Sequence, residues 1–174
     1  GQSLEAWVAH VPGLKVVAPS TPADAKGLLV ASIRDPDPVV FIEHKDLYDT
    51  TGPVSEELYE TPFKHARLVR QGADVTVVAW LSAVPLVEEA AQDLAAEGVD
   101  VEILDPRTLV PFDLGAVVES VKKTGRLVVV QEAVRRLGFG AEVAAAVAGS
   151  DAFSGLKAPI MRVGNPGVPV PHGK

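Results

Sequence analysis

A short apolar run followed by a glycine turn most constrains the fold of this chain. Leu127–Val130 is an unbroken series of aliphatic residues, which is typical of a parallel strand covered on both faces. Polar residues begin at Gln131, and the glycine turn at residues 138–140 leads into a predicted alanine-rich helix at 141–148. We therefore expect a strand at the middle of a sheet, with a ligand or partner edge at its carboxyl end.

Strands and helices are predicted to alternate along the rest of the chain. The other predicted strands lie at 15–18, 39–42, 75–81, 99–104 and 160–163, and the other predicted helices at 3–10, 21–33, 85–97 and 113–123. This alternation implies right-handed crossovers and an α/β fold with a doubly wound, mostly parallel sheet. Residues 105–111 are predicted to be a loop. The aperiodic stretch 49–62 predicts an exposed linker, so we place a domain boundary near residue 60.

The two helices nearest the amino terminus carry clear sequence signals. Ser3 is a candidate cap for the first helix, whose predicted apolar face holds Leu4, Trp7, Val8 and Val11. Thr21-Pro22-Ala23-Asp24 combines a hydroxyl cap, a proline at the first helical position and an early carboxylate, which is a strong start for the second helix. The chain lacks an initiating methionine, from which we expect a fragment or a processed chain.

Composition excludes several classes of function. With no cysteine among 174 residues, disulfides and thiolate chemistry are excluded. The net charge of −7 and the lack of a basic, aromatic stripe argue against nucleic acid as a partner. There is no 18-residue apolar span and no signal peptide, so we expect no membrane partner and a cytoplasmic or mitochondrial-matrix setting. The four histidines show no zinc-ligand spacing, and no Gly-x-Ser-x-Gly elbow occurs.

Three local patterns are candidates for chemistry. The glycine turn could bind phosphate, but Val143 stands where the dinucleotide fingerprint needs its third glycine, so a structural turn is favoured. Arg107 follows a predicted buried strand and should share a sheet edge with Glu132 and Arg135. A structural or subunit-interface role is favoured there over a clamp for a substrate carboxylate. The turn at residues 35–37 could present carbonyls to a cation, although the residues alone favour a plain proline turn.

Taken together, the segments GQSLEAWVAHVPGLKVVAPSTPADAKGLL, IRDPDPVVFIEHKDLY, DVEILDPRTLVPFD and TGRLVVVQEA…GFGAE resemble the beta subunit of the thiamine-diphosphate-dependent first component of 2-oxoacid dehydrogenase complexes. The resemblance covers nearly the whole chain, in the family's order. It implies the second half of a transketolase-like pyrimidine-binding domain plus linker at 1–60, and a transketolase-like C-terminal domain at 61–174.

The resemblance also implies an activity and its site residues. The family oxidatively decarboxylates a 2-oxoacid and reductively acylates a lipoyl group, with thiamine diphosphate and Mg²⁺ bound at an alpha/beta interface mostly by residues outside this chain. A histidine and a glutamate of the family's catalytic set lie upstream of Gly1, so the chain alone should be inactive. Gln2 and Ser3 would lie at the substrate entrance. Matching positions in the family bind potassium through carbonyls, here those of Ser32, Ile33, Asp35 and Asp37.

The implied partners are an alpha subunit, in an alpha-2-beta-2 heterotetramer, and the lipoyl acyltransferase component. Arg107, Glu132 and Arg135 would then lie at a subunit interface. Two alternatives stay open at this point. The chain could come from an acetoin dehydrogenase beta subunit, or it could act only as a non-catalytic assembly and docking module.

Overall fold

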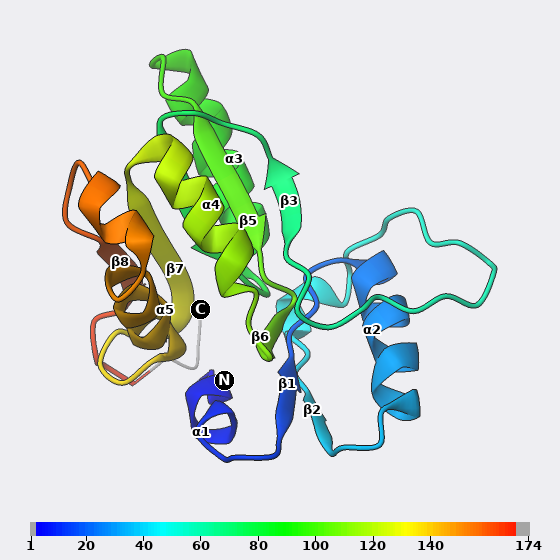
Figure 1. The fold of residues 1–174 in the computed structure, drawn as a ribbon. Coiled ribbons are helices and arrows are strands. Elements are labelled where there is room, and N and C mark those ends of the chain that lie inside the picture. Colours follow the sequence, from blue (N-terminus) through cyan, green and yellow to red (C-terminus); the bar gives the residue numbers. More distant parts are fainter. Residues whose placement is uncertain (1–2, 170–174) are drawn as a thin grey trace.

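The computed structural model describes residues 3–169, which fold around two sheets (Figure 1). The first sheet is small and belongs mainly to the amino-terminal part of the chain. Its elements are α1 (Glu5–Ala9), β1 (Lys15–Val17), α2 (Pro22–Arg34), β2 (Val39–Phe41) and the 3₁₀ turn η1 (Lys45–Leu47). β1 and β2 are parallel neighbours, joined by α2 as expected for a βα unit.

The second sheet has five strands in the order β3-β5-β4-β7-β8. Its elements are β3 (Arg67–Arg70), β4 (Val75–Ala79), α3 (Ala83–Ala96), β5 (Val101–Asp105), α4 (Leu114–Thr124), β7 (Leu127–Val134), α5 (Phe139–Ala148), η2 (Asp151–Gly155) and β8 (Met161–Asn165). All pairs are parallel except β3 with β5. The predicted α/β fold with a mostly parallel sheet is confirmed, although β4 and not β7 is the central strand.

The segment predicted as a loop at 105–111 contains a strand, β6 (Thr108–Val110). It does not join the sheet of its own part of the chain, because it pairs antiparallel with β1 in the small sheet. The prediction was wrong here since a three-residue strand has little period of its own, and its partner lies about ninety positions away in the sequence. β6 thus completes the small sheet and joins the two parts of the chain.

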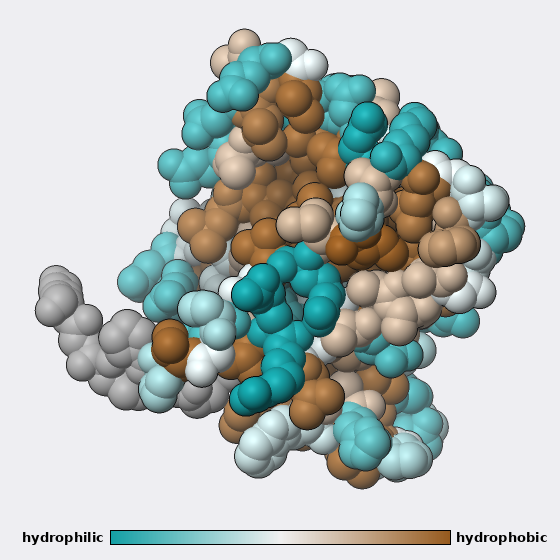
Figure 2. Space-filling model, turned by 90° about the vertical axis from the view of Figure 1, so that its left-hand side faces the viewer, coloured by the Kyte–Doolittle hydropathy of each residue, from teal (hydrophilic) through white to brown (hydrophobic). Residues whose placement is uncertain are grey.

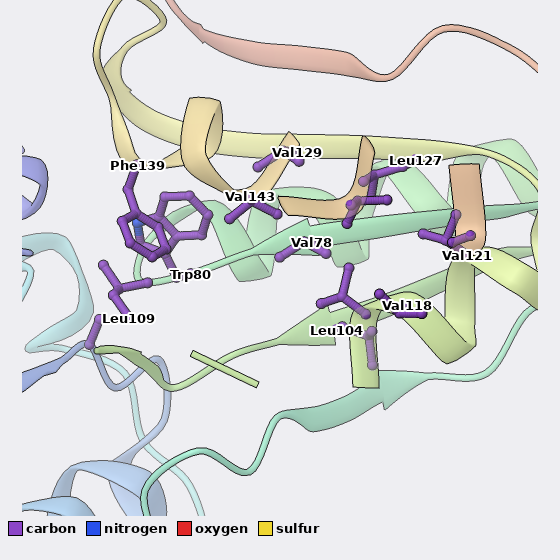
Figure 3. Close-up of a cluster of buried hydrophobic side chains, with 14 of the residues drawn as sticks. Val78, Trp80, Leu104, Leu109, Val118, Val121, Leu127, Val129, Phe139 and Val143 are labelled. Carbon is purple, nitrogen blue, oxygen red and sulfur yellow. The ribbon is translucent and has the colours of Figure 1, made fainter. Parts of the chain in front are cut away.

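Helices cover both faces of the five-stranded sheet, which places the core in two layers. On one face α3 buries Ala83, Val84, Val87 and Ala91 against β4 and β5. On the other face α4 and α5 cover the opposite side chains of the same strands. Figure 3 shows this second layer, where Val118, Val121 and Val143 lie over Val78, Leu127 and Val129. Every second residue of β7 is buried, as expected for a strand whose two faces pack unequally.

Of the two helix caps that the sequence predicted, the one at Thr21 forms and the one at Ser3 does not. Thr21 accepts a hydrogen bond from the Asp24 N–H at 3.1 Å and starts α2. Asp113 caps α4 in the same way, and Gly125 ends that helix in the left-handed conformation. Ser3 does not cap α1: the cap position is Leu4, which makes no side-chain bond there. None of the helices within residues 3–169 is long and apolar enough to cross a membrane.

The linker predicted at 49–62 is mostly exposed, but its end is fixed to α2. The Tyr59 hydroxyl donates to the Ala23 carbonyl at 2.7 Å, and the Thr61 N–H donates to the Gly27 carbonyl at 3.1 Å. Thr61 is buried by this contact. The close approach is available because Gly27 has no side chain: a Cβ there would lie 2.2 Å from Thr61 Oγ1. The segment therefore docks on the helix before the second sheet begins.

We expect Gly27→Ala to destabilise the chain by about 1–3 kcal/mol, since the added methyl group overlaps Thr61 and the linker must move away. This loss exceeds the gain in helix propensity, which is at most about 1 kcal/mol. Urea unfolding and the rate of proteolytic cleavage in 49–62 would measure it. Gly115→Ala in α4 is the matched control, because its Cβ would meet nothing closer than 3.7 Å. Equal stability of the two variants would contradict the docking of the linker.

A buried polar network lies under α4. Glu102 on β5 is buried, accepts a hydrogen bond from the Ser120 hydroxyl at 2.5 Å, and pairs with the Lys123 ammonium. Thr76 Oγ1 lies 2.6 Å from Ser120 Oγ and 2.9 Å from Thr124 Oγ1. Burial by itself would raise the pKa of the Glu102 carboxyl, but Lys123, Ser120 and a backbone N–H together hold that pKa below its ordinary value.

The network predicts a loss of stability in acid. A carboxyl whose pKa is lower in the folded state stabilises the fold above its unfolded pKa, and this contribution disappears as the pH falls through the folded value. We expect Glu102→Gln to cost about 1–3 kcal/mol at pH 7, and much less at a pH below both values. Urea unfolding at both pH values measures this difference. Glu119→Gln removes an exposed partner of Lys122 and should change stability little at either pH. A cost independent of pH would contradict this role.

Candidate functional site

A cluster of polar and aromatic side chains lies where the two parts of the chain meet. We define the junction cluster as Glu5 of α1, His44 after β2, Trp80 and Ser82 between β4 and α3, and Glu132 of β7. The two β-strands of the large sheet contribute from their carboxyl-terminal portions, the edge at which α/β sheets place ligands. The cluster is therefore the best candidate for a site within the described residues.

His44 and Glu132 join the small sheet to the large one. The Nε2 atom of His44 contacts Glu132 Oε2, and the Ser82 hydroxyl lies 3.5 Å from the same oxygen. On the other side of the ring, the Asp46 N–H donates to Nδ1 at 3.2 Å. Because Nδ1 accepts a hydrogen bond, the ring proton of the neutral form lies on Nε2 and is donated to the carboxylate. Both ring nitrogens are engaged, so this imidazole orients Glu132 and is not a free base.

Glu5 is the most unusual member of the junction cluster. It is only 1% exposed, and its Oε1 accepts a hydrogen bond from the Trp80 indole N–H at 3.2 Å. Its Oε2 atom is buried without a hydrogen-bond partner among the described residues. Burial raises the pKa of the Glu5 carboxyl, and the nearby Glu132 carboxylate raises it further. Burial and the neighbouring carboxylate thus both disfavour the charged form of Glu5.

The corner that holds Trp80 is conformationally special. Leu81, which follows it, is buried and has a φ of 53°, a left-handed backbone that is rare for a branched side chain. Such residues concentrate at functional sites, where surrounding packing maintains them. The Trp80 ring stands edge-on to Phe139 at a centroid distance of 5.9 Å, and Figure 3 shows the two rings together at one end of the core. The indole is therefore rigidly placed to donate to Glu5.

A small hollow opens beside His44. Its volume is about 190 Å³, and it lies between the start of α2 and the segment after β2. Its lining includes Ser20, Thr21, Pro22, His44 and Tyr48. The Tyr48 hydroxyl at its rim donates to Glu43 at 3.2 Å, and this carboxylate raises the pKa of the Tyr48 phenol.

The predicted substrate-entrance residues lie at the edge of the described region. Ser3 lies one residue before the cap position of α1 and is partly exposed, with a φ of 48°. Gln2 lies outside the described residues. Because Glu5 is two positions after Ser3, the buried carboxyl group fixes the part of the chain nearest to the predicted entrance. No sequence signal indicated this role, because a glutamate in a first helical turn is ordinarily exposed.

The predicted apolar face of α1 is not turned to the core. Trp7 is 74% exposed, and Leu4 and Val11 are also exposed, whereas Glu5 is buried. Only Val8 and its neighbour Ala9 pack against the core. The prediction was wrong because Trp80 supplies a hydrogen-bond donor for the glutamate, which orients the helix with its carboxylate inward. An exposed tryptophan of this kind is typical of a surface that another protein covers.

The predicted cation-binding turn follows α2. The Lys15 ammonium contacts the carboxylates of Asp35 at 2.6 Å and Asp37 at 3.0 Å, which lowers the pKa of Asp35. The single ammonium therefore offsets one of the two negative charges. The carbonyls of Ser32 and Ile33 are different, because the helical donors four residues later are missing. Pro36 has no N–H, and the Asp37 N–H donates to Asp35 Oδ1 at 2.9 Å.

The three predicted interface residues do not form one cluster. Arg107 donates to Asp24 at 2.9 Å and to the His65 carbonyl at 2.7 Å, so it ties the β5–β6 turn to α2. Glu132 belongs to the junction cluster. Arg135 is exposed beyond the end of β7, where its N–H donates to Asn165. The three residues do lie at the carboxyl ends of β5 and β7, which share one edge of the sheet as expected. Their side chains, however, contact different neighbours.

A second polar cluster, which the sequence did not reveal, surrounds Asp24. Arg67 contributes its Nε at 3.3 Å from Asp24 and also lies 3.3 Å from the buried carboxylate of Asp105. Burial raises the pKa of Asp105, although Ser20 and the Arg107 N–H both donate to it. These contacts join α2 to β3 and β5. These residues are far apart in the sequence, so no local pattern could predict the cluster. The sequence indicated only that Asp24 is a carboxylate in the first turn of a helix.

The glycine turn before α5 serves packing. Gln131 is buried, and its Oε1 accepts a hydrogen bond from the Gly140 N–H at 2.7 Å, while its Nε2 donates to the Val134 carbonyl at 2.9 Å. A Cβ on Gly138 would lie 2.1 Å from that Nε2 atom. The Gly140 N–H, which would have to bind a phosphate, thus already donates to Gln131. This agrees with the prediction that the glycine turn is structural.

Comparison with known proteins places the chain in a family. Residues 64–174 match the family described as transketolase, C-terminal domain. The chain belongs to this family. Residues 1–51 match the transketolase pyrimidine-binding domain. A solved structure titled split gene transketolase, inactive beta4 tetramer, has the same fold with a TM-score of 0.78, at 23% identity, covering 94% of this chain and 52% of that one.

Curated relatives share the sequence over nearly the whole chain. The beta subunit of acetoin:2,6-dichlorophenolindophenol oxidoreductase from Cupriavidus necator is 51% identical over 98% of this chain and 50% of its own length. The pyruvate dehydrogenase E1 beta subunit of Rhizobium meliloti is 46% identical, over 98% of this chain and 37% of that protein. The mitochondrial 2-oxoisovalerate dehydrogenase beta subunit 2 of Arabidopsis thaliana is also 46% identical, over 98% and 48%.

These matches confirm the predicted resemblance to beta subunits of 2-oxoacid dehydrogenase first components. The chain spans about half the length, or less, of the curated relatives described above. Both family matches agree with an amino-terminal pyrimidine-binding part and a transketolase-like C-terminal part. The boundary near residue 60 stays a prediction.

Proposed function

We propose that this chain is part of the beta subunit of a thiamine-diphosphate-dependent 2-oxoacid dehydrogenase first component. The complete enzyme would decarboxylate a 2-oxoacid oxidatively and transfer the acyl group to a lipoyl group. The observation that carries the proposal is identity of 46–51% to three such or closely related beta subunits over 98% of the chain. We further propose that these 174 residues lack a complete catalytic set and are inactive alone.

The cofactor would be bound mainly by residues outside this chain. Thiamine diphosphate, when bound, supplies the carbanion chemistry of the reaction. Among the described residues, no group of three or more acidic or histidine side chains is placed to hold a metal ion such as Mg²⁺. The Gly140 amide is also occupied by Gln131. The role proposed for this chain is therefore to shape the substrate entrance through Gln2 and Ser3 and to hold the helix behind them.

Potassium is proposed at the turn after α2. The carbonyls of Ser32 and Ile33 lack their helical donors, and those of Asp35 and Asp37 would complete an oxygen site of the kind that hard cations prefer. Because Lys15 offsets one of the two carboxylate charges, one negative charge remains beside the carbonyls, and the site favours a monovalent ion. We expect the melting temperature of the complete subunit to be higher in KCl than in choline chloride at equal ionic strength. Equal melting temperatures would contradict the site.

Partners are proposed from the family and from exposed apolar surface. α1 exposes Trp7, and a shallow groove of about 570 Å³ lies along α5 and the segment before β8, lined by Ala148, Phe153, Ile160 and five other apolar residues. Figure 2 views this side of the molecule and shows brown areas gathered between polar ones. We propose that an alpha subunit, in an alpha-2-beta-2 heterotetramer, and the lipoyl acyltransferase component cover such surfaces. Arg107, Glu132 and Arg135 stay proposed interface residues.

The proposal is tested with the complete subunit and its alpha partner. We expect thiamine-dependent decarboxylation of pyruvate or a branched-chain 2-oxoacid, with reduction of an added electron acceptor. Absence of activity with every 2-oxoacid, but activity with acetoin, would favour the acetoin dehydrogenase alternative, to which the first relative points. Absence of all thiamine-dependent activity from an assembled complex would contradict the proposed function.

An assembly and docking module is the second candidate, and the exposed apolar side chains of α1 favour it for the chain as it stands. Size-exclusion chromatography and calorimetry with the alpha subunit and the binding domain of the acyltransferase test it. No association in either experiment would contradict the module. We propose a bacterial cytoplasmic or mitochondrial-matrix location, which agrees with the mitochondrial name of the Arabidopsis relative.

A further inference from the structure

We propose that Glu5 is a positioning residue for the proposed reaction: its buried carboxyl group, bound to the Trp80 indole, holds α1 against the C-terminal domain and thereby sets the position of the substrate entrance at Ser3. This inference rests on the proposed function, because the entrance is part of that proposal. It concerns a residue that lies two positions from the entrance and has no assigned role in the reaction.

The first argument is that α1 has few other means of staying in place. It contains five residues, and its cap position makes no side-chain hydrogen bond, so it has little intrinsic stability. Most of its apolar surface is exposed, and its packing is limited to Val8 and Ala9 against the core. The 3.2 Å bond from the Trp80 indole to Glu5 is the side-chain hydrogen bond that joins α1 to the large sheet within the described residues.

The second argument is that the receiving side is rigid. Trp80 is buried and packs edge-on to Phe139, and Leu81 fixes the corner in a left-handed conformation. Because the indole N–H of Trp80 is held rigidly, its hydrogen bond restricts the position of the Glu5 carboxyl group. The Oε2 atom of Glu5 is buried and has no hydrogen-bond partner among the described residues. Burying such an atom costs folding free energy, so its presence is an argument for a functional role of this residue.

The third argument concerns charge. The charged groups that influence Glu5 are the Glu132 carboxylate of β7 and the His44 imidazole after β2. α1 also packs against β1 and α5, where Lys15 is bound by Asp35 and Glu142 is exposed. Ionised Glu5 would therefore be a buried carboxylate close to the partly exposed carboxylate of Glu132. We expect ionisation of Glu5, as the pH rises through its raised pKa, to loosen α1 and to weaken substrate binding before it slows turnover.

The experiment uses the complete subunit assembled with its alpha partner. Glu5→Gln keeps an oxygen that accepts from Trp80 but cannot ionise, and Glu5→Ala removes the contact. We expect Glu5→Gln to retain kcat/KM within about twofold of the value that the unaltered enzyme has below the Glu5 pKa, and to lose the fall in kcat/KM that accompanies ionisation of Glu5 as the pH rises. Glu5→Ala should lower kcat/KM by about 10- to 100-fold, mainly through KM. Glu89→Gln, an exposed glutamate of α3, is the matched control and should behave as the unaltered enzyme.

A spectroscopic readout reports on the contact without any turnover. The enzyme is labelled with 5-fluorotryptophan, and the Trp80 resonance is assigned by its absence in Trp80→Phe. We expect this fluorine resonance to shift with rising pH along the same curve as the fall in kcat/KM, and Glu5→Gln to abolish the shift. If Glu5→Ala does not assemble, the pH profile and the fluorine spectrum of Glu5→Gln still decide the question.

Two outcomes would overturn the inference. One is a pH profile of kcat/KM that Glu5→Gln leaves unchanged, and the other is an assembled Glu5→Ala enzyme with unaltered KM. Failure of the proposed function looks different, because the unaltered enzyme would then lack thiamine-dependent turnover. In that case a Trp80 resonance that does not titrate with Glu5 would also reject the contact itself.

Discussion

Replacing Asp24 with alanine is expected to destabilise the chain by about 3–5 kcal/mol, the cost of breaking a buried ion pair by removing one partner. Asp24 is 5% exposed and receives Arg107 at 2.9 Å, Arg67 at 3.3 Å and the Thr21 hydroxyl at 2.8 Å. Its loss leaves two guanidinium groups without their shared carboxylate at the boundary of α2 and the large sheet. Urea unfolding followed by circular dichroism measures the effect.

The control for Asp24 is another ion pair that joins α2 to a distant segment. Glu60 pairs with Arg34 at the end of α2, and both side chains are about half exposed. Glu60→Ala should cost at most about 1 kcal/mol, because water screens an exposed pair. Similar costs for Asp24→Ala and Glu60→Ala would show that the Asp24 cluster does not hold the two parts of the chain together.

Trp80→Ala is expected to cost about 3–5 kcal/mol, the usual loss when a large buried aromatic residue is truncated. Trp80 is 2% exposed and is the largest of the fully buried side chains. Its removal leaves a cavity beside Phe139 and takes away the hydrogen bond to Glu5, so the buried carboxyl loses its donor. Thermal and urea unfolding measure the change, and the loss of α1 should appear as faster amide exchange at Ala6 and Val8.

Trp80→Phe separates the two contributions. It keeps an aromatic ring beside Phe139 but has no N–H for Glu5, so we expect a smaller cost of about 1–3 kcal/mol. Amide exchange in α1 should still be faster than in the unaltered chain. Unchanged exchange in both variants would mean that α1 is held by its packing on the core and not by Trp80.

Much of the fold follows from local sequence signals. The strand at 127–130, the helix start at Thr21 and the helix at 113–123 all form as predicted, because caps and apolar runs act within a few residues. The strands predicted at 75–81 and 99–104 also form, with ends that differ by a few residues. These elements are sufficient to predict the α/β class.

The elements that the sequence missed are those that depend on distant partners. β3 was not predicted, and it exists through antiparallel pairing with β5. β6 was predicted to be a loop, and it pairs with β1. The apolar face predicted for α1 is largely exposed, because the helix is oriented by one hydrogen bond from Trp80. In each case the deciding contact crosses between segments that are far apart in the chain.

The residues of the candidate site also divide into those that the sequence predicted and those that only the tertiary structure revealed. The sequence by itself determined the βα pattern, the caps, the charged carboxyl end of β7 with Glu132, and a resemblance that the family matches confirm. Only the tertiary structure decided that Glu132 pairs with His44, that Arg107 binds Asp24, and that Glu5 is buried on Trp80. The physical reason is that local preferences act over a few residues, whereas the cost of burying a charge or a carboxyl group is met by partners that folding brings together.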